Sequence, residues 1–541
     1  MQGSIPTRPR RLGAALAALA TASLIAVGLL AGADSRAAHG SAPHIVFITT
    51  DDQTVNDMLA MTRTQAHLGD LGVSFENSYV AFPLCCPSRA TYLSGQHAHN
   101  HNVTANVPPD GGYAKLNDNQ TLPVWLQGAG YRTIHIGKMP NGFGDDPAYV
   151  PPGWRLPDGE FYGFLPDPPS AYYGFKLNEN GTPTQYEATD YQTDVYADLA
   201  VDAIDRHLTD HPTRPLYLEV QFFAPHDPAE PAPRHAGYFA GAELPKDKSF
   251  NEKAFKDKPN WLRAVKRMGG GLQSKIQFRY RKRLESLLAV DEAVNAIVSK
   301  LAAEGILGET YVVFTSDNGY MQGQHRLHQG KFVAYDPSAK VPLLIRGPGI
   351  PAGETSKELV SNVDLVKTFL DISSGSPGIT VDGRTLLPFA IDPNKDSNRP
   401  LLFETGPPVA LADAVSAGAA GGKKPKRSSK RVKNLDLDRT AQLAGRAIKP
   451  PKYRALRTKR YLLIKYSDGG RELYDMSKDP LQTDSVYGDA RYAKVRQWML
   501  KRIKKYTRCR GEACNRRLRK APKPLKPSKK VRGGGRNRLA P

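Results

Sequence analysis

Four apolar runs rich in β-branched residues recur in the first 320 residues, and each leads into polar residues. They cover residues 44–50, 132–137, 216–223 and 311–316. Continuous apolar runs of this length are typical of strands buried on both faces, as in a sheet enclosed by helices. Between them, residues 193–208 and 283–301 repeat apolar positions at the period of amphipathic helices. The pattern predicts an α/β fold, in which functional groups gather at the carboxyl ends of the strands.

The length of the chain predicts more than one folding unit. Its 541 residues exceed what a single hydrophobic core usually holds. Near the C-terminus, residues 453–457 and 461–466 predict a β-hairpin, followed by a helix at about 491–506. The predicted parts are a leader at 1–38, a catalytic domain at 43–405, a flexible Ala/Gly/Lys-rich insertion at 406–435, a C-terminal subdomain at 436–514 and a basic disordered tail at 515–541.

The N-terminus has the pattern of a secretory signal peptide. Three arginines, Arg8, Arg10 and Arg11, precede an apolar stretch at 13–33 that ends in small residues. The stretch is also near the length that spans a bilayer, so an uncleaved membrane anchor is the alternative. Both interpretations predict a protein that is secreted or associated with the cell surface.

Charge is distributed very unevenly along the chain. Residues 421–541 contain 38 Lys/Arg and 9 Asp/Glu, whereas residues 1–420 contain 37 and 44, within a net charge of +22. Such a basic end suits an anionic polymer, and we expect one at the cell surface in preference to nucleic acid. A solvated tail without a dedicated partner is the alternative.

The four cysteines form two close pairs. In an exported chain, Cys509 and Cys514 predict a local disulfide. Cys85 and Cys86 are adjacent, and adjacent cysteines rarely pair because the geometry is strained. These two residues therefore need another explanation.

Acidic and amide side chains follow two of the predicted strands. Asp51 and Asp52 come after the run 44–50, and Asp317 and Asn318 come after the run 311–316. Such oxygen ligands suit Ca²⁺ or Mg²⁺ better than a metal that prefers thiolates. Taken singly, each pair could instead be a turn or a helix cap.

The run Cys85-Cys86-Pro87-Ser88-Arg89-Ala90-Thr91-Tyr92-Leu93-Ser94-Gly95 is the most specific feature of the sequence. Pro87 and Ser88 suit the first turn of a helix, whose backbone N–H groups can hold an anion. The run resembles the sulfatase signature, C-x-P-S-R followed by x-x-x-L-[ST]-G. Two buried cysteines beside a helix are the structural alternative.

Further landmarks extend this resemblance in the expected order. Asp51-Asp52, the run Thr315-Ser316-Asp317-Asn318-Gly319, and Gly330-Lys331 ahead of Val341-Pro342 resemble sulfatase motifs. The similarity covers residues 44–348 and resumes at 453–479. It implies an alkaline-phosphatase-like α/β/α sandwich with a large mixed sheet and a small C-terminal antiparallel α+β subdomain. It also implies a hydrolase of sulfate esters.

The resemblance implies a role for each matching residue. A dedicated formylglycine-generating enzyme would oxidise Cys85 to formylglycine (3-oxoalanine), and Arg89 would hold that group. Lys138, His226 and Lys331 would surround the sulfate, and His226 would protonate or orient the leaving oxygen. Hydration of the aldehyde gives two hydroxyls on one carbon, of which one attacks sulfur and the other loses its proton to expel sulfate. Ca²⁺, in preference to Mg²⁺, would be bound by Asp51, Asp52, the modified Cys85, Asp317 and Asn318.

One motif departs from the common sulfatase pattern. Many sulfatases have Gly-Lys-x-His, whereas this chain has Gly137-Lys138-Met139-Pro140-Asn141, similar to the N-acetylglucosamine-6-sulfatase branch. That similarity implies a sulfated glycan substrate such as 6-O-sulfated N-acetylglucosamine, with Asn141 in part of the space of the histidine. The base for the elimination step stays open, and the candidates are His135, His325 and His328.

Two rival functions remain open from the sequence. A phosphomonoester or phosphonate-ester hydrolase could use the same fold, metal and nucleophile. A non-catalytic binder of anionic polysaccharide could result if Cys85 were never modified. Fold kinship alone does not decide between them.

Overall fold

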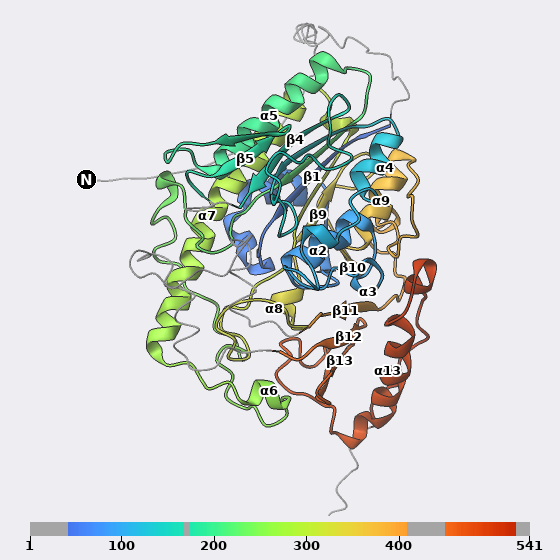
Figure 1. The fold of residues 1–541 in the computed structure, drawn as a ribbon. Coiled ribbons are helices and arrows are strands. Elements are labelled where there is room, and N and C mark those ends of the chain that lie inside the picture. Colours follow the sequence, from blue (N-terminus) through green and yellow to red (C-terminus); the bar gives the residue numbers. More distant parts are fainter. Residues whose placement is uncertain (1–41, 167–171, 408–449, 526–541) are drawn as a thin grey trace, which may run out of the picture. The chain divides into compact units, whose positions relative to one another are not determined.

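The computed structural model describes residues 42–166, 172–407 and 450–525. The predicted leader and most of the predicted insertion lie outside these ranges. The core is a ten-stranded sheet in the order β10-β2-β9-β8-β1-β7-β3-β4-β5-β6 (Figure 1). Its strands are β1 (His44–Thr50), β2 (Val73–Tyr79), β3 (Arg132–Gly137), β4 (Gly159–Leu165), β5 (Lys176–Glu179), β6 (Thr182–Gln185), β7 (Leu216–Gln221), β8 (Thr310–Ser316), β9 (Leu343–Arg346) and β10 (Glu354–Ser361).

The four apolar runs form the centre of this sheet. They are β1, β3, β7 and β8, which pair in parallel and are buried along their whole length. β5 runs antiparallel to β4 and β6, and β9 runs antiparallel to β2 and β8, so the sheet is mixed, as predicted. In register, Thr50 lies beside Ser316, and Gly137 lies beside Gln221. The carboxyl ends of all four strands therefore meet at one edge.

Helices cover both faces of the sheet. The helices α5 (Gln192–Asp210) and α7 (Gly270–Ala303) lie on one face, and α2 (Cys85–Ser94), α4 (Leu122–Gly128) and α9 (Asp364–Ser373) lie on the other (Figure 1). Successive residues of β1 alternate between the two cores, because side chains of a strand point to opposite faces. The shorter helices are η1 (Val55–Ala60), α1 (Thr62–Thr64), η2 (Gln65–Gly69), α3 (Ala98–His101), η3 (Tyr113–Lys115), η4 (Pro233–His235), α6 (Asn260–Arg263), η5 (Leu307–Glu309), α8 (Asp336–Ala339) and α10 (Leu387–Ile391).

A second, antiparallel sheet forms the C-terminal part. It contains β11 (Leu401–Glu404), β12 (Tyr453–Arg457), β13 (Tyr461–Tyr466) and β14 (Arg471–Asp475), and α13 (Ala493–Tyr506) packs on it. The predicted hairpin is β12–β13. β11 falls inside the predicted catalytic domain, yet it pairs with β12. The sequence could not place it there, because strand pairing joins segments that are far apart in the chain.

The segment after α13 is tied to the body of the protein. Cys509 and Cys514 form a disulfide. The short helix η6 (Ala490–Tyr492) precedes α13, and η7 (Gly511–Asn515) begins within the disulfide loop. Residues 515–525, which we expected to begin a disordered tail, are instead held by backbone hydrogen bonds from Leu518 to Asn398 (3.1 Å) and from Leu525 to Arg491 (3.0 Å). No helix in the described part of the chain has the length and apolar character of a membrane span.

Candidate active site

Two neighbouring strand ends bring three carboxylates together. Asp51 and Asp52 follow β1, and Asp317 follows the adjacent β8; the Asp52 N–H donates to Asp317 Oδ1 at 3.2 Å. Asp52 has a φ of 70°, a left-handed conformation that aspartate tolerates better than most residues. One oxygen from each carboxylate and the Cys85 Sγ all lie within 4.8 Å of one another. The structure therefore brings together three of the predicted metal ligands and the predicted nucleophile.

Cys85 is the first residue of α2, and every residue of this helix is buried. Its Sγ lies 3.4 Å from Asp51 Oδ1 and 2.9 Å from the Nζ of Lys331. Burial raises the pKa of the Cys85 thiol, and the Asp51 carboxylate raises it further. The sulfur thus faces both the oxygen ligands and a buried ammonium group.

Arg89 lies one helical turn after Cys85, so the two side chains share a face of α2. The guanidinium is fully buried, with Nε 2.9 Å from Asp317 Oδ2 and Nη2 3.4 Å from Asp51 Oδ2. Its Nη1 also donates to the carbonyl oxygen of Lys138 at 2.9 Å and to Gln221 Oε1 at 3.0 Å. Arg89 therefore links α2 to the ends of four strands.

The three predicted sulfate-binding side chains converge on the carboxylates. Lys138, after β3, forms an ion pair with Asp51, and Lys331 forms one with Asp52. His226, after β7, lies with Nε2 3.8 Å from Asp52 Oδ2. A nitrogen of this imidazole is also within 4.8 Å of both the Cys85 Sγ and an Asp51 oxygen. All three residues thus sit beside the predicted nucleophile.

The charged groups of the site shift one another's pKa values. Burial alone would raise the pKa of Asp51, but four cationic side chains outweigh burial and hold the pKa below its ordinary value. Burial lowers the pKa of His226; Asp51 and Asp52 oppose this shift, and the nearby lysines add to it. Burial and the Asp51 charge raise the pKa of Asp317 to about 6. The cationic groups around Asp51 are Lys138, His226, Lys331 and Arg89.

The oxygen atoms fit a hard divalent cation. Asp52 Oδ2 and Asn318 Oδ1 are buried and have no hydrogen-bond partner among the described residues. The Asn318 amide nitrogen is held by Asp52 Oδ1 at 2.5 Å, so the Asn318 side chain lies beside the carboxylates. Carboxylate and amide oxygens are the ligands that Ca²⁺ and Mg²⁺ take in proteins.

Asn141 lies next to the nucleophile helix. Its carbonyl oxygen accepts from the Cys86 thiol at 3.8 Å and from the Tyr113 N–H at 2.7 Å. Its side-chain Oδ1 is buried and unpartnered among the described residues. This amide oxygen is therefore an unsatisfied buried acceptor close to the start of α2.

The three histidines that the sequence offered as the base for the elimination step contact residues other than Cys85. His135 packs between the rings of Trp154 and Phe161, and its Nε2 lies 3.2 Å from the Gly137 carbonyl oxygen. His325 is paired through Nδ1 with Glu252 at 2.8 Å. His328 is half-buried, and burial together with Arg279 lowers its pKa to about 4. None of these contacts involves Cys85.

Sequence reasoning missed Gln221, the last residue of β7. Its Oε1 accepts from Arg89 and from the Tyr92 hydroxyl at 2.9 Å, and its Nε2 donates to Glu219 at 2.9 Å. All four residues are buried. The available signal was that Glu219 and Gln221 are polar residues within an otherwise apolar run.

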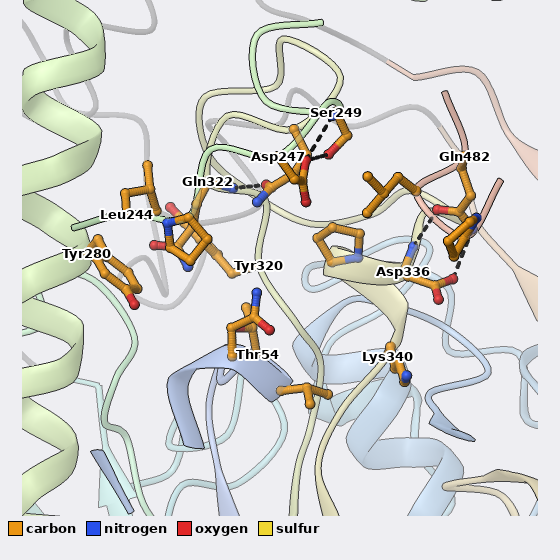
Figure 2. Close-up of a pocket in the computed structure, with 17 residues that line it drawn as sticks. Thr54, Leu244, Asp247, Ser249, Tyr280, Tyr320, Gln322, Asp336, Lys340 and Gln482 are labelled. Carbon is orange, nitrogen blue, oxygen red and sulfur yellow. Dashed lines mark hydrogen bonds between the residues drawn. The ribbon is translucent and has the colours of Figure 1, made fainter. Parts of the chain in front are cut away.

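A cavity of about 240 Å³ lies beside the ligand-bearing loops (Figure 2). Thr54, two residues after Asp52, and Tyr320, two residues after Asn318, both line it. Figure 2 also shows Asp336 of α8 hydrogen-bonded to Gln482 of the C-terminal part. Cys85, Lys138 and His226 are not among the residues that line this cavity.

A comparison with known protein families identifies the family of this chain. The sequence profile of the family named Sulfatase matches residues 43–376, which is more than half of the chain. The chain belongs to the sulfatase family. The match includes every candidate site residue from Asp51 to Lys331.

Several relatives are about one-third identical to this sulfatase over the aligned residues. It is 36% identical to human N-acetylglucosamine-6-sulfatase over 68% of the chain and 67% of that protein, and 32% identical to the arylsulfatase of Volvox carteri over 93% and 79%. It is 34% identical to an extracellular sulfatase SULF-1 homolog of Drosophila melanogaster, over 67% of the chain. The chain spans 32% of the length of that homolog and 48% of the Caenorhabditis elegans one.

Solved structures confirm the fold of this sulfatase. One, a complex with its substrate D-glucosamine-2-N,6-O-disulfate, superposes with a TM-score of 0.67 at 22% identity, over 86% of the chain and 97% of that structure. A phosphonate monoester hydrolase from Silicibacter pomeroyi superposes with a TM-score of 0.59 at 21% identity, over 86% and 94%. Because both superpose, the fold by itself does not distinguish sulfate from phosphonate esters.

Proposed function

We propose that this sulfatase is a secreted enzyme that hydrolyses sulfate esters of glycans, using a formylglycine made from Cys85 and a bound Ca²⁺. The observation that carries the proposal is the position of residue 85. It begins a buried helix, faces three clustered carboxylates and touches the ammonium group of Lys331.

A divalent cation would give this site a net positive charge, which suits an anionic substrate. Three buried carboxylates face three buried cations, so the groups present are close to neutral overall. A Ca²⁺ held by Asp51, Asp52, Asp317, Asn318 and residue 85 would leave the site positive. A positive site stabilises a sulfate ester and the negative charge that develops on its oxygens.

The other side chains would orient the groups that react. A formylglycine at position 85 supplies, as its hydrate, a hydroxyl nucleophile that a serine could not regenerate. Lys331, whose Nζ is 2.9 Å from the Cys85 Sγ, would hold an oxygen at that position. His226 would move a proton at the leaving oxygen. Because α2 is buried throughout, the modifying enzyme would act before the chain folds.

The substrate proposal rests on relatives and on Asn141. One relative is named N-acetylglucosamine-6-sulfatase, and another is named an extracellular sulfatase. The unpartnered Oδ1 of Asn141 can accept a hydroxyl or an amide N–H of a sugar. We therefore favour 6-O-sulfated N-acetylglucosamine within a glycan.

The test is sulfate release by protein produced together with a formylglycine-generating enzyme. We expect release from 6-sulfated N-acetylglucosamine, and loss of turnover in Cys85→Ala. Cys86→Ala removes the neighbouring thiol and should keep most of the activity. Faster turnover of aryl phosphate or phosphonate esters than of sulfate esters would contradict the proposal and favour the rival hydrolase.

A further inference from the structure

The helix α13 has two different faces. Val495, Met499 and Ile503 are buried against the small sheet, and Figure 1 shows the helix lying along β12 and β13. The opposite face is exposed and carries four lysines at helical spacing. With a rise of 1.5 Å per residue, the stripe is about 16 Å long. Its members are Lys494, Lys501, Lys504 and Lys505.

The positive charge continues beyond the helix on a fixed scaffold. Cys509–Cys514 closes the next loop, the Tyr506 hydroxyl donates to the Arg516 carbonyl oxygen at 2.6 Å, and Asn515 accepts from Arg399 at 2.8 Å. A fixed backbone lowers the ordering cost of binding. The basic face, as we name this surface, comprises the exposed side chains of Arg491, Lys494, Lys501, Lys504, Lys505, Arg508, Arg510, Arg516, Arg517, Arg519, Lys520 and Lys523.

Among the described residues, few carboxylates compensate this charge. Residues 490–525 contain fourteen Lys/Arg and one Asp/Glu. In the described part of the chain, Arg491 is the one member of the basic face within 4.0 Å of a carboxylate. Lys501 lies three residues from Lys504 and four from Lys505, and like charges at these spacings destabilise a helix. The free protein thus keeps repulsion that an anionic partner would relieve.

The surroundings of the lysines favour a polysaccharide over other polyanions. Binding of single-stranded nucleic acid uses exposed aromatic rings for stacking, but Trp498 is half-buried and Arg502 covers its ring at 3.9 Å. A membrane-surface helix presents large apolar residues beside its lysines, and between 493 and 508 no large hydrophobic residue is exposed. Lysine and arginine donors match sulfate and carboxylate oxygens.

We propose that the basic face is a docking surface for a sulfated polysaccharide. It would hold the polymer while the active site acts on its sulfate esters, so its link to turnover rests on the proposed function. The substrate class is then a polymeric glycan, and the enzyme meets it with a surface outside the catalytic pocket.

The test compares two four-lysine variants in a Cys85→Ala background. One replaces the α13 stripe by glutamine, which has similar helix propensity. The matched control replaces four exposed lysines elsewhere by glutamine and removes the same net charge. These are Lys248, Lys275, Lys357 and Lys395. Affinity for heparin at physiological salt should fall about tenfold in the α13 variant and change less than about twofold in the control.

Three results would overturn the proposal. The first is equal loss of affinity in both variants, which would indicate a net-charge effect. The second is equal binding of chemically desulfated heparin, and the third is equal or tighter binding of single-stranded DNA or anionic vesicles. Because the background cannot form formylglycine, the result is independent of whether the parent releases sulfate.

Discussion

Arg89 determines the geometry of the site at the scale of single residues. It contacts carboxylates from two strand ends, a main-chain oxygen after β3 and the amide of Gln221. The signature indicated Arg89 from sequence, whereas the Gln221 contact depends on strand register and helix position. Contacts of that kind cannot be predicted from residue spacing.

Replacing Arg89 by lysine should damage both stability and turnover. One ammonium group cannot reproduce the planar fork, so buried acceptors lose partners at about 1–3 kcal/mol each. We expect kcat/KM for sulfate release to fall at least about 100-fold. Urea unfolding and initial rates measure the two effects. Arg155→Lys, a matched change at an exposed guanidinium, should behave like the parent, and parent-like kinetics of Arg89→Lys would contradict this role.

The carboxylates should make stability depend on Ca²⁺. A cation that binds only the folded state at 100 times its Kd adds about 2.7 kcal/mol to the free energy of unfolding. We expect Ca²⁺ to raise the Tm of EDTA-treated protein and to have little effect on Asp52→Asn. The readout is thermal unfolding, which needs no formylglycine. Equal Tm shifts in both proteins would contradict the proposed ligand set.

At the scale of helices and strands, the sequence predicted the elements whose pattern of apolar residues is contained within the element itself. β1, β3, β7 and β8 were continuous apolar runs, and α5 and α7 had clear helical periods. β10 was not predicted, because six of the eight residues in Glu-Thr-Ser-Lys-Glu-Leu-Val-Ser are polar and its strand character comes from pairing with β2.

The short helix α3 should link stability to pH through His99. Its Nδ1 lies 2.8 Å from Glu404 Oε2 and its Nε2 lies 2.8 Å from the Cys509 carbonyl oxygen, so both nitrogens face acceptors. Burial opposes the charge, but Glu404 outweighs it and raises the pKa of His99. Burial likewise opposes the charge of Glu404, but the His99 contact lowers the pKa of Glu404 to about 2.

The sign of the pH effect follows from these two shifts. A raised histidine pKa stabilises the fold below about 6.5, and that contribution is lost as the pH rises through the folded-state value. The lowered Glu404 pKa adds stability above about 4.3 that is lost toward pH 2. His99→Gln should therefore destabilise most between about pH 4.3 and 6.5, measured by urea unfolding. A cost that grows above pH 8, or an equal profile in the control His211→Gln, would contradict this assignment.

We expect that the segment connecting β11 to β12 can be shortened without loss of the fold. The Thr405 N–H donates to the Tyr453 carbonyl oxygen at 3.2 Å, so the two ends lie side by side. Replacing residues 409–448 by Gly-Asn-Gly-Ser should preserve cooperative unfolding and add about 1 kcal/mol through lower loop-closure entropy. Thermal and urea unfolding test this, and a loss of cooperativity would show that the removed segment is required for the fold.

At the scale of the whole molecule, the chain separates two kinds of surface. The catalytic part carries a slight acidic excess, and the C-terminal part carries the basic face. The sequence predicted this asymmetry and the family fold, because both follow from composition and motifs. It placed the start of the tail too early, since the contacts that hold residues 515–525 come from distant segments.

The central claim is that residue 85 acts as an aldehyde and not as a thiol. Mass spectrometry of the tryptic peptide 64–89, from protein made in its own host, tests this claim most directly. We predict the mass of formylglycine at position 85 and an unchanged cysteine at position 86. A peptide in which both residues are intact cysteines would contradict the account.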